Sequence, residues 1–309
     1  MIRPREIATG VELFPARTPT LPPATHTNSY ALGERDVLLV EPATPHDDER
    51  AEWLAWARGL VSKGRRIVAI VVTHHHPDHV GGAAFLAGEL GAPLWAHART
   101  IARLADPSGP VRLIDEIAPA GGAPFVPWGA AGATFARALE EGDEIDLAGP
   151  TPQRWRVLHT PGHAPGHVCL FEERVGAVVA GDMVASEGTI LIEPRDGDMA
   201  EYLAQLERLA GLGARVALPA HGAPIEDPTR LFRHYIAHRL GREVKVVAAL
   251  AELAAATSLE DLVPIVYADT PPFLWPIARM SLEAHLIKLE REGRAGRSGE
   301  GWARLHDGA

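Results

Sequence analysis

Thr73-His74-His75-His76-Pro77-Asp78-His79-Val80-Gly81-Gly82 is the stretch that decides the fold and chemistry of this 309-residue chain. It follows an apolar, β-branched run, Ile67 to Val72, which predicts a buried strand, and it leads into a helical pattern from Val80 to Leu90. Ligands of α/β folds lie at such strand ends. Imidazoles and carboxylates are good zinc ligands, and crowded as they are here they repel one another unless a cation joins them. The stretch therefore predicts a metal site, with a solvated His-rich turn as the alternative. The candidate ligands are His74, His76, Asp78 and His79.

Three further candidate ligands follow predicted strands farther along the chain. His163 stands in Thr-Pro-Gly-His after the run 155–158, Asp182 in Gly-Asp after 177–180, and His221 in Ala-His-Gly after 216–218. Each by itself suits an ordinary loop residue. Together with the first motif they supply a ligand set that converges from several strand ends on one edge of a sheet.

The composition places the chain among globular proteins. Hydrophobic residues make up 46% and charged residues 23%, which excludes a disordered or fibrous chain. No apolar run reaches the roughly 18 residues of a membrane helix, and Met1 to Phe14 lacks the pattern of a secretion signal. We therefore expect a cytoplasmic protein with no membrane partner. The single cysteine, Cys169, excludes an internal disulfide and a cysteine-cluster metal site.

The net charge of −10 argues against a protein that coats nucleic acid without specificity. The charge is uneven, because residues 229–309 hold 11 basic and 10 acidic residues while residues 1–228 hold 19 and 30. A polyanion is therefore best tolerated by the C-terminal part.

The pattern of predicted elements divides the chain at residue 228. Residues 1–228 alternate short buried strands with helical stretches, which predicts an α/β catalytic domain. Residues 229–309 contain three helical patterns followed by a glycine-punctuated ribbon, which predicts a small winged-helix-like domain. Pro107 to Gly132 is rich in Gly, Pro and Ala, and it is either an insertion that covers something or a surface loop.

On its metal motifs the chain resembles the metallo-β-lactamase superfamily, whose pattern is H-x-H-x-D-H, then a distant His, an Asp and a final His. The resemblance implies a four-layer αββα fold and two divalent metal ions, zinc by expectation, with manganese or iron sharing these ligands. It implies that His74, His76 and His163 hold one ion and that Asp78, His79 and His221 hold the other, with Asp182 bridging both. It further implies a metal-bound hydroxide as the attacking group. Asp78 is then the catalytic residue that accepts the proton of the water.

Further motifs resemble the β-lactamase-like protein two subfamily, which joins this fold to a winged-helix-like domain. They are Thr27-Asn28-Ser29-Tyr30, Tyr235-Ile236-Ala237-His238-Arg239 with Arg242-Glu243, and the helix around Leu282 to Glu292. Members of that group are implied to include a single-strand RNA endonuclease, and related proteins are acyl-carrier thioesterases. One departure is Glu41-Pro42-Ala43, which stands where the family usually has Asp-Thr-Gly and affects the expected support of the metal ligands.

Neighbouring members of the superfamily fit less well. A true β-lactamase typically has a signal peptide and a Cys or another residue where Asp182 stands, and a flavin-linked di-iron reductase has Glu in the place of His76. A mononuclear iron persulfide dioxygenase stays as a minor alternative, and so does a DNA-binding regulator that senses metal. We do not expect duplex DNA as a partner, because the last helix presents acidic residues beside its basic ones.

The substrate divides the remaining hypotheses. His167 flanks His163, and His238, Arg239 and Arg242 share a helix face that could present cations to a phosphate or carboxylate. We therefore assign these four residues to substrate binding, with ligand support for His167 and an interdomain salt-bridge face for the others as alternatives. The whole-chain resemblance favours cleavage of single-stranded RNA, whereas the acidic balance favours the alternative, a small acyl thioester or ester.

Overall fold

A computed structural model describes residues 3–106, 132–253 and 255–305. The chain separates into two compact units. The first comprises Met1–Thr160, Gly166–Thr189 and Gly213–Pro228, and the second Pro161–Pro165, Ile190–Leu212 and Thr229–Ala309. As independently folding domains, 1–228 and 229–309 remain a prediction. Apart from Gly132, the Pro107 to Gly132 segment lies outside the described residues.

The larger sheet of the first unit has the order β1-β2-β3-β4-β5-β6-β7. Strands β1 to β4 pair antiparallel, and β4 to β7 pair parallel. A parallel half-sheet brings the carboxyl ends of several strands to one edge, which is where the ligand loops begin. Its strands are β1 (Arg5–Ala8), β2 (Val11–Arg17), β3 (His26–Leu32), β4 (Asp36–Val40), β5 (Arg66–Val71), β6 (Leu94–His97) and β7 (Phe135–Leu139).

The smaller sheet of the first unit has the order β12-β11-β10-β9-β8. Only β11 and β12 pair parallel within it, and the other neighbours are antiparallel. Both β11 and β12 therefore end at the same edge, each followed by a candidate ligand. Its strands are β8 (Glu144–Leu147), β9 (Gln153–His159), β10 (Val168–Glu172), β11 (Ala177–Gly181) and β12 (Val216–Pro219).

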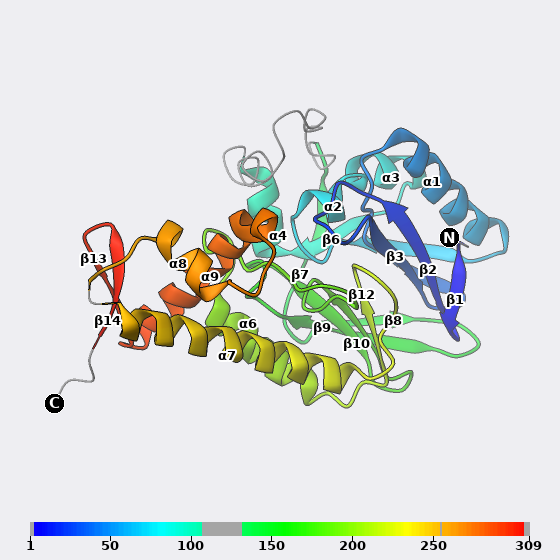
Figure 1. Cartoon of the computed structure of the whole chain (residues 1–309). Coiled ribbons are helices and arrows are strands. Elements are labelled where there is room, and N and C mark those ends of the chain that lie inside the picture. Colours follow the sequence, from blue (N-terminus) through cyan, green and yellow to red (C-terminus); the bar gives the residue numbers. More distant parts are fainter. Residues whose placement is uncertain (1–2, 107–131, 254, 306–309) are drawn as a thin grey trace. The chain divides into compact units, whose positions relative to one another are not determined.

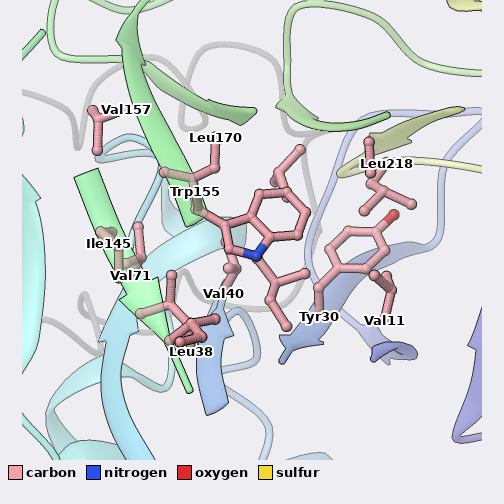
Figure 2. Close-up of a cluster of buried hydrophobic side chains, with 14 of the residues drawn as sticks. Val11, Tyr30, Leu38, Val40, Val71, Ile145, Trp155, Val157, Leu170 and Leu218 are labelled. Atoms are coloured by element: carbon pink, nitrogen blue, oxygen red, sulfur yellow. The ribbon is translucent and has the colours of Figure 1, made fainter. Parts of the chain in front are cut away.

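The two sheets of the first unit enclose a hydrophobic core, and Trp155 lies among its side chains (Figure 2). Leu38 and Val40 of the larger sheet and Leu170 of the smaller one join it, all of them fully buried. The Trp155 indole N–H donates to Gln153 Oε1 at 2.9 Å, so the ring is buried without an unsatisfied donor. This core holds the two sheets together and so brings their ligand-bearing edges close.

A helical layer covers the outer face of the larger sheet (Figure 1). It is built from α1 (Asp47–Ser62) and α3 (Ala83–Leu90), and Trp53 and Trp56 of α1 pack into a second core cluster. Three acidic residues in the first turn of α1 suit the positive end of the helix dipole. Helix α3 ends at Gly91, whose φ of 60° is the left-handed conformation that glycine adopts most easily. Among the described residues, this unit also contains the short helices α2 (Pro77–Val80) and α4 (Ala98–Ala105).

The second unit is mainly helical and has a core of its own. Leu250 of α7, Leu262 of α8, Leu282 and Leu286 of α9 and Trp302 of β14 pack together in it. Leu282, Leu286 and Leu289 recur along α9 at intervals of three and four residues and form one buried face. Ser258 caps α8 by accepting from the Asp261 N–H. The elements are α6 (Met199–Ala210), α7 (Pro228–Glu252), α8 (Leu259–Val266), η1 (Pro272–Leu274), α9 (Trp275–Arg291), β13 (Ala295–Ser298) and β14 (Gly301–Arg304).

The strand β3 was missed from the sequence, because its polar residues conceal a buried strand. Ser29 donates to the carbonyl of Glu41 and accepts from the Trp53 indole N–H at 2.8 Å, and Thr27 is fully buried. Internal partners satisfy these polar groups, so the usual apolar signature of a strand is absent. Among the described residues, no helix is both long and apolar enough to span a membrane.

Candidate metal centre

The first ligand motif begins directly after β5 and runs into α2. His76 is the N-cap of α2 and Pro77 its first residue, an arrangement that suits proline because its missing N–H needs no partner there. Gly81 and Gly82 follow, and the backbone of the loop after β4 passes close to both of them. A Cβ on Gly81 would lie 2.8 Å from the Ala43 carbonyl oxygen, and one on Gly82 would lie 2.9 Å from that of Thr44. The absence of a Cβ on the two glycines therefore lets the motif pack closely against the loop after β4.

Four predicted ligands of the first unit meet at one point. His79 Nε2 lies 3.8 Å from Asp78 Oδ1 and 3.6 Å from Asp182 Oδ1. His221 Nε2 lies 3.4 Å from Asp78 Oδ2 and 3.4 Å from Asp182 Oδ1. Asp78, His79 and His221 bring their ligand atoms within 4.8 Å of one another. Strand ends of both sheets thus deliver one mixed imidazole and carboxylate cluster.

Burial and charge act against each other in this cluster. Burial alone lowers the pKa of His221, but Asp182 and Asp78 raise it to about 9. Burial also opposes charge on His79, whose pKa the carboxylates of Glu41, Asp182 and Asp78 raise well above the ordinary value. Burial raises the pKa of Asp182, but His221 and His79 hold it well below its usual range. The carboxylates therefore favour positive charge at this site, which protons on the two histidines supply in the metal-free protein and which a bound metal ion would supply instead.

The cluster fits a divalent ion on one specific observation. His79 is fully buried, and its Nε2 has no hydrogen-bond partner although two carboxylate oxygens face it. A buried ring nitrogen without a hydrogen bond is costly unless another ligand satisfies it. An ion held between the His79 nitrogen and the carboxylates of Asp78 and Asp182 would satisfy all three groups at once.

Acceptors behind the two imidazoles set their orientation. His79 Nδ1 lies 3.1 Å from Glu41 Oε1, and His221 Nδ1 lies 2.9 Å from the carbonyl oxygen of His26. A proton on Nδ1 that donates to such an acceptor leaves the Nε2 lone pair for a metal, which is the usual arrangement around zinc-bound histidine. With the proton on Nδ1, both residues would offer Nε2 to a metal ion.

Glu41 is the residue that the sequence analysis missed as a functional group. It has a positive φ of 61°, is buried, and also accepts from the Thr73 hydroxyl. The Glu-Pro-Ala sequence thus supplies a carboxylate to His79 despite its departure from Asp-Thr-Gly. The departure from Asp-Thr-Gly could have identified Glu41 in the sequence, because an acid at the end of β4 can reach the ring of His79.

The start of β3 holds the turn that carries His221. Asn28 Nδ2 donates to the carbonyls of Pro219 at 2.9 Å and Gly222 at 2.8 Å, on either side of that ligand. The Tyr30 hydroxyl donates to the Pro219 carbonyl at 2.8 Å. The motif Thr27 to Tyr30 therefore supports a ligand loop 191 residues away in the sequence.

His74 and His76 lie beside this cluster. His74 Nε2 and His76 Nδ1 are 3.0 Å apart, and the His74 ring centroid lies 4.0 Å from that of His79. Their close nitrogens suit two ligands of one ion. His163 belongs to the second unit, where its Nδ1 lies 2.9 Å from the Leu191 carbonyl oxygen, the same kind of backing acceptor that His221 has. As metal ligands the seven residues remain predictions.

His167 lies in a supporting position. It is fully buried, its Nδ1 is 2.7 Å from the Thr160 hydroxyl, and its Nε2 accepts from the Asp182 backbone N–H at 3.1 Å. Both ring nitrogens are thus engaged inside the first unit. This geometry corresponds to the alternative of ligand support, with Asp182 as the ligand that is held, and it does not present His167 to a substrate.

The predicted substrate cations of the second unit have different surroundings. His238 is exposed, but Arg239 is buried, donates to the Ile190 carbonyl and lies 5.8 Å from the Tyr202 ring centroid. Arg242 donates to the Val266 carbonyl at 2.6 Å and to Asp269 at 2.8 Å. The two guanidinium groups are therefore engaged within the unit, and of the three only His238 is presented to solvent.

The last helix shows the same engagement of its basic residues. Arg279 pairs with Glu260 at 2.8 Å, Lys288 pairs with Glu243 at 2.7 Å, and Arg291 pairs with Asp198. A helix that enters a DNA groove needs such side chains for phosphates and base edges. That duplex DNA is not a partner remains a prediction from the sequence.

Comparison with known families identifies the superfamily to which this chain belongs. The family model of the metallo-beta-lactamase superfamily matches residues 22–221, and that of the beta-lactamase associated winged helix domain matches residues 258–302. The chain belongs to the metallo-β-lactamase superfamily. The fold class predicted from the sequence is thereby confirmed, as are the winged-helix domain and the enzyme class, a hydrolase of this fold.

Individual relatives cover most of the chain. The chain is 29% identical over 276 residues to a Beta-lactamase-like protein 2 homolog of Drosophila melanogaster, covering 87% of this chain and 83% of the relative. It is 28% identical over 230 residues to an Atrochrysone carboxyl ACP thioesterase of Aspergillus fumigatus, covering 74% and 60%. A metallo-beta-lactamase family protein from Thermus thermophilus is similar in structure, with a TM-score of 0.75, 29% identity and coverage of 97% and 100%.

Proposed function

We propose that this hydrolase uses two divalent metal ions, zinc by expectation, to cleave a small acyl thioester or ester in the cytoplasm. His74, His76 and His163 would hold one ion and Asp78, His79 and His221 the other, with Asp182 shared between them. The observation that carries the metal dependence is the buried Nε2 of His79, which faces two carboxylates without a hydrogen bond. When bound, such ions activate water near neutral pH and polarise the carbonyl oxygen of the substrate.

The chain's own residues perform the proton transfers. Asp78 is the more exposed of the two central carboxylates, with 14% of its side chain accessible against 10% for Asp182. It is therefore placed to accept a proton from the attacking water and return it to the leaving thiolate or alkoxide. Asp182 is held by His167, and Glu41 holds His79, so the groups around Asp78 keep their orientation during the reaction.

The hydrogen-bond partners of two arginines in the second unit support the proposal of an acyl substrate. Arg239 and Arg242 were expected to bind a phosphate or carboxylate of the substrate, but both guanidinium groups have internal partners. The net charge of −10 also disfavours a polyanion. The named thioesterase activity of the Aspergillus fumigatus relative agrees with a thioester.

Single-stranded RNA remains the second candidate, on a separate observation. The first half of α7 exposes the basic residues Arg230 and Arg233 together with the ionisable His234 and His238. Such a helix face can follow a phosphate backbone. This was the substrate favoured from the sequence, on the resemblance to the β-lactamase-like protein two subfamily.

One experiment tests the hydrolase and separates its substrates. Purified zinc-loaded protein is incubated with acyl-coenzyme A thioesters under a thiol-detecting reagent, and separately with end-labelled single-stranded RNA. A chelator-treated sample and the His76→Ala variant serve as controls. Thiol release that both controls abolish supports the thioesterase. RNA cleavage that both abolish, without thiol release, replaces it by the nuclease. Turnover of neither substrate by protein with bound zinc refutes both substrate classes.

A further inference from the structure

The segment from Ile190 to Asp198, in the second unit, contains the hydrogen-bond acceptor that faces His163. The Leu191 carbonyl oxygen lies 2.9 Å from His163 Nδ1. The rest of the segment is a tight turn, in which Glu193 accepts from the backbone N–H of Gly197 at 2.6 Å and from Arg195 Nε at 2.6 Å. The orientation of the His163 ring therefore depends on where this segment holds Leu191.

Arg239 of α7 anchors one end of that segment. Its guanidinium donates to the Ile190 carbonyl, one residue before Leu191, and lies 5.8 Å from the Tyr202 ring centroid. The side chain is only 3% exposed. A buried guanidinium beside an aromatic ring is confined to few orientations, so it fixes the carbonyl that it binds. The position of Leu191 is thus set from the C-terminal helices.

The other end of the segment is anchored to α6 and α9. The Asp198 N–H donates to the Gly162 carbonyl at 2.8 Å, and Arg291 of α9 pairs with the Asp198 carboxylate. Gly162 has a φ of 132°, and a Cβ there would lie 2.3 Å from the Tyr202 Cα. The residue before His163 is therefore pressed directly against α6, and α9 holds the cap of that helix.

We propose that Arg239 is a positioning residue for the metal centre, acting through the Ile190 to Leu191 backbone on the imidazole of His163. The proposal rests on the proposed function in that His163 must be a metal ligand. It assigns a role to the motif Tyr235 to Arg239, which substrate binding does not explain. By this route α7 affects how tightly His163 binds its metal ion.

Arg242 provides a closely matched control. It lies three residues along the same helix, donates to a backbone carbonyl, that of Val266, and lies 4.2 Å from the Tyr267 ring centroid. Its side chain is 10% exposed. Arg242 thus has the two kinds of contact described for Arg239 and pairs in addition with Asp269, and these partners lie in or next to α8 and not in the segment behind His163.

The experiment is a zinc titration against a competing chelator on full-length protein, with the visible absorption of the cobalt-substituted protein as a second readout. Arg239→Met is expected to weaken one of the two zinc ions about tenfold, the lower end of the effect of removing a group that supports a ligand. Its cobalt spectrum should change, and Arg239→Lys should restore part of the loss. Arg242→Met should leave both the affinities and the spectrum as in the wild type.

Arg291→Gln keeps the test valid if Arg239→Met does not fold. The Arg291 side chain is 61% exposed, so its loss leaves the core intact while it loosens the same segment. We expect a smaller weakening of the same zinc ion. Zinc affinities within twofold of the wild type and an unchanged spectrum in the folded Arg239 and Arg291 variants overturn the proposal, as does equal weakening by Arg242→Met. A wild-type chain that binds no zinc refutes the proposed function instead.

Discussion

Replacing Glu41 by glutamine tests whether the acid behind His79 tunes the metal centre. The Glu41 carboxylate is 1% exposed, lies 3.1 Å from His79 Nδ1 and also accepts from the Thr73 hydroxyl. The amide has the same shape and one acceptor oxygen, so the variant removes the charge and leaves the packing. In the metal-free protein, burial lowers the pKa of His79 and Glu41 is one of the three carboxylates that raise it, so Glu41→Gln lowers that pKa.

The expected loss of zinc affinity is about 10- to 100-fold, which is typical for removal of a carboxylate that supports a ligating histidine. It corresponds to about 1.4 to 2.7 kcal/mol of binding free energy. The stabilisation that saturating zinc gives to the folded state should fall by a similar amount, because zinc binds the folded protein preferentially.

Competition with a chromophoric chelator measures the affinity, and thermal melting with and without zinc measures the stabilisation. Glu49→Gln is the matched control, since Glu49 is also a buried carboxylate of the first unit, with Arg3 as its partner at 2.6 Å. That variant should melt earlier and bind zinc normally. Wild-type zinc affinity in the Glu41 variant would refute the argument that this carboxylate tunes His79.

Three further predictions concern other parts of the centre. Asp78→Asn should lower kcat at least about 100-fold, because it removes the proton acceptor; steady-state kinetics of the zinc-loaded variant would refute this by finding kcat within tenfold of the wild type. Gly162→Ala should cost about 1–3 kcal/mol of unfolding free energy, since φ is 132° and the Cβ would meet the Tyr202 backbone at 2.3 Å; an unchanged denaturation midpoint contradicts it. In metal-free protein the pKa of His221 is raised from 6.5 to about 9, so the stabilisation that its charge gives to the folded state is complete below pH 6.5 and is lost as the pH rises through 9. Between pH 7 and 9 the melting temperature of the metal-free His221→Ala variant should therefore fall less than that of the metal-free wild type. An equal fall in the wild type and the variant excludes His221 as the cause.

The local parts of the structure were accessible from sequence. The predicted strands at 67–72 and 177–180 correspond to β5 and β11, and the helical pattern from Val80 to Leu90 includes α3. Each has an apolar period that is complete within a few residues, so no distant contact is needed to recognise it. The polar strand β3 escaped because its hydrogen-bond partners, among them Pro219 and Gly222, lie far away in the sequence.

The roles of individual polar residues divide in the same way. The order of the metal motifs identified the superfamily and the candidate ligands, because each ligand follows its own strand in a turn that is specified locally. The assignment of Arg239 and Arg242 to substrate depended on helix spacing alone, and helix spacing does not show which groups the neighbouring elements bring to a face.

The sequence by itself determined the fold class, the family and the set of candidate metal ligands, since strand periodicity, helix signals and ligand order are all properties of short segments. Only the tertiary structure decided that Glu41 backs His79, that β3 holds the His221 turn, and that Arg239 anchors the segment behind His163. Each of these depends on two chain segments meeting after the sheets and helices have packed. The hydrogen bonds that join two such segments form only after this packing, so neither segment alone specifies them.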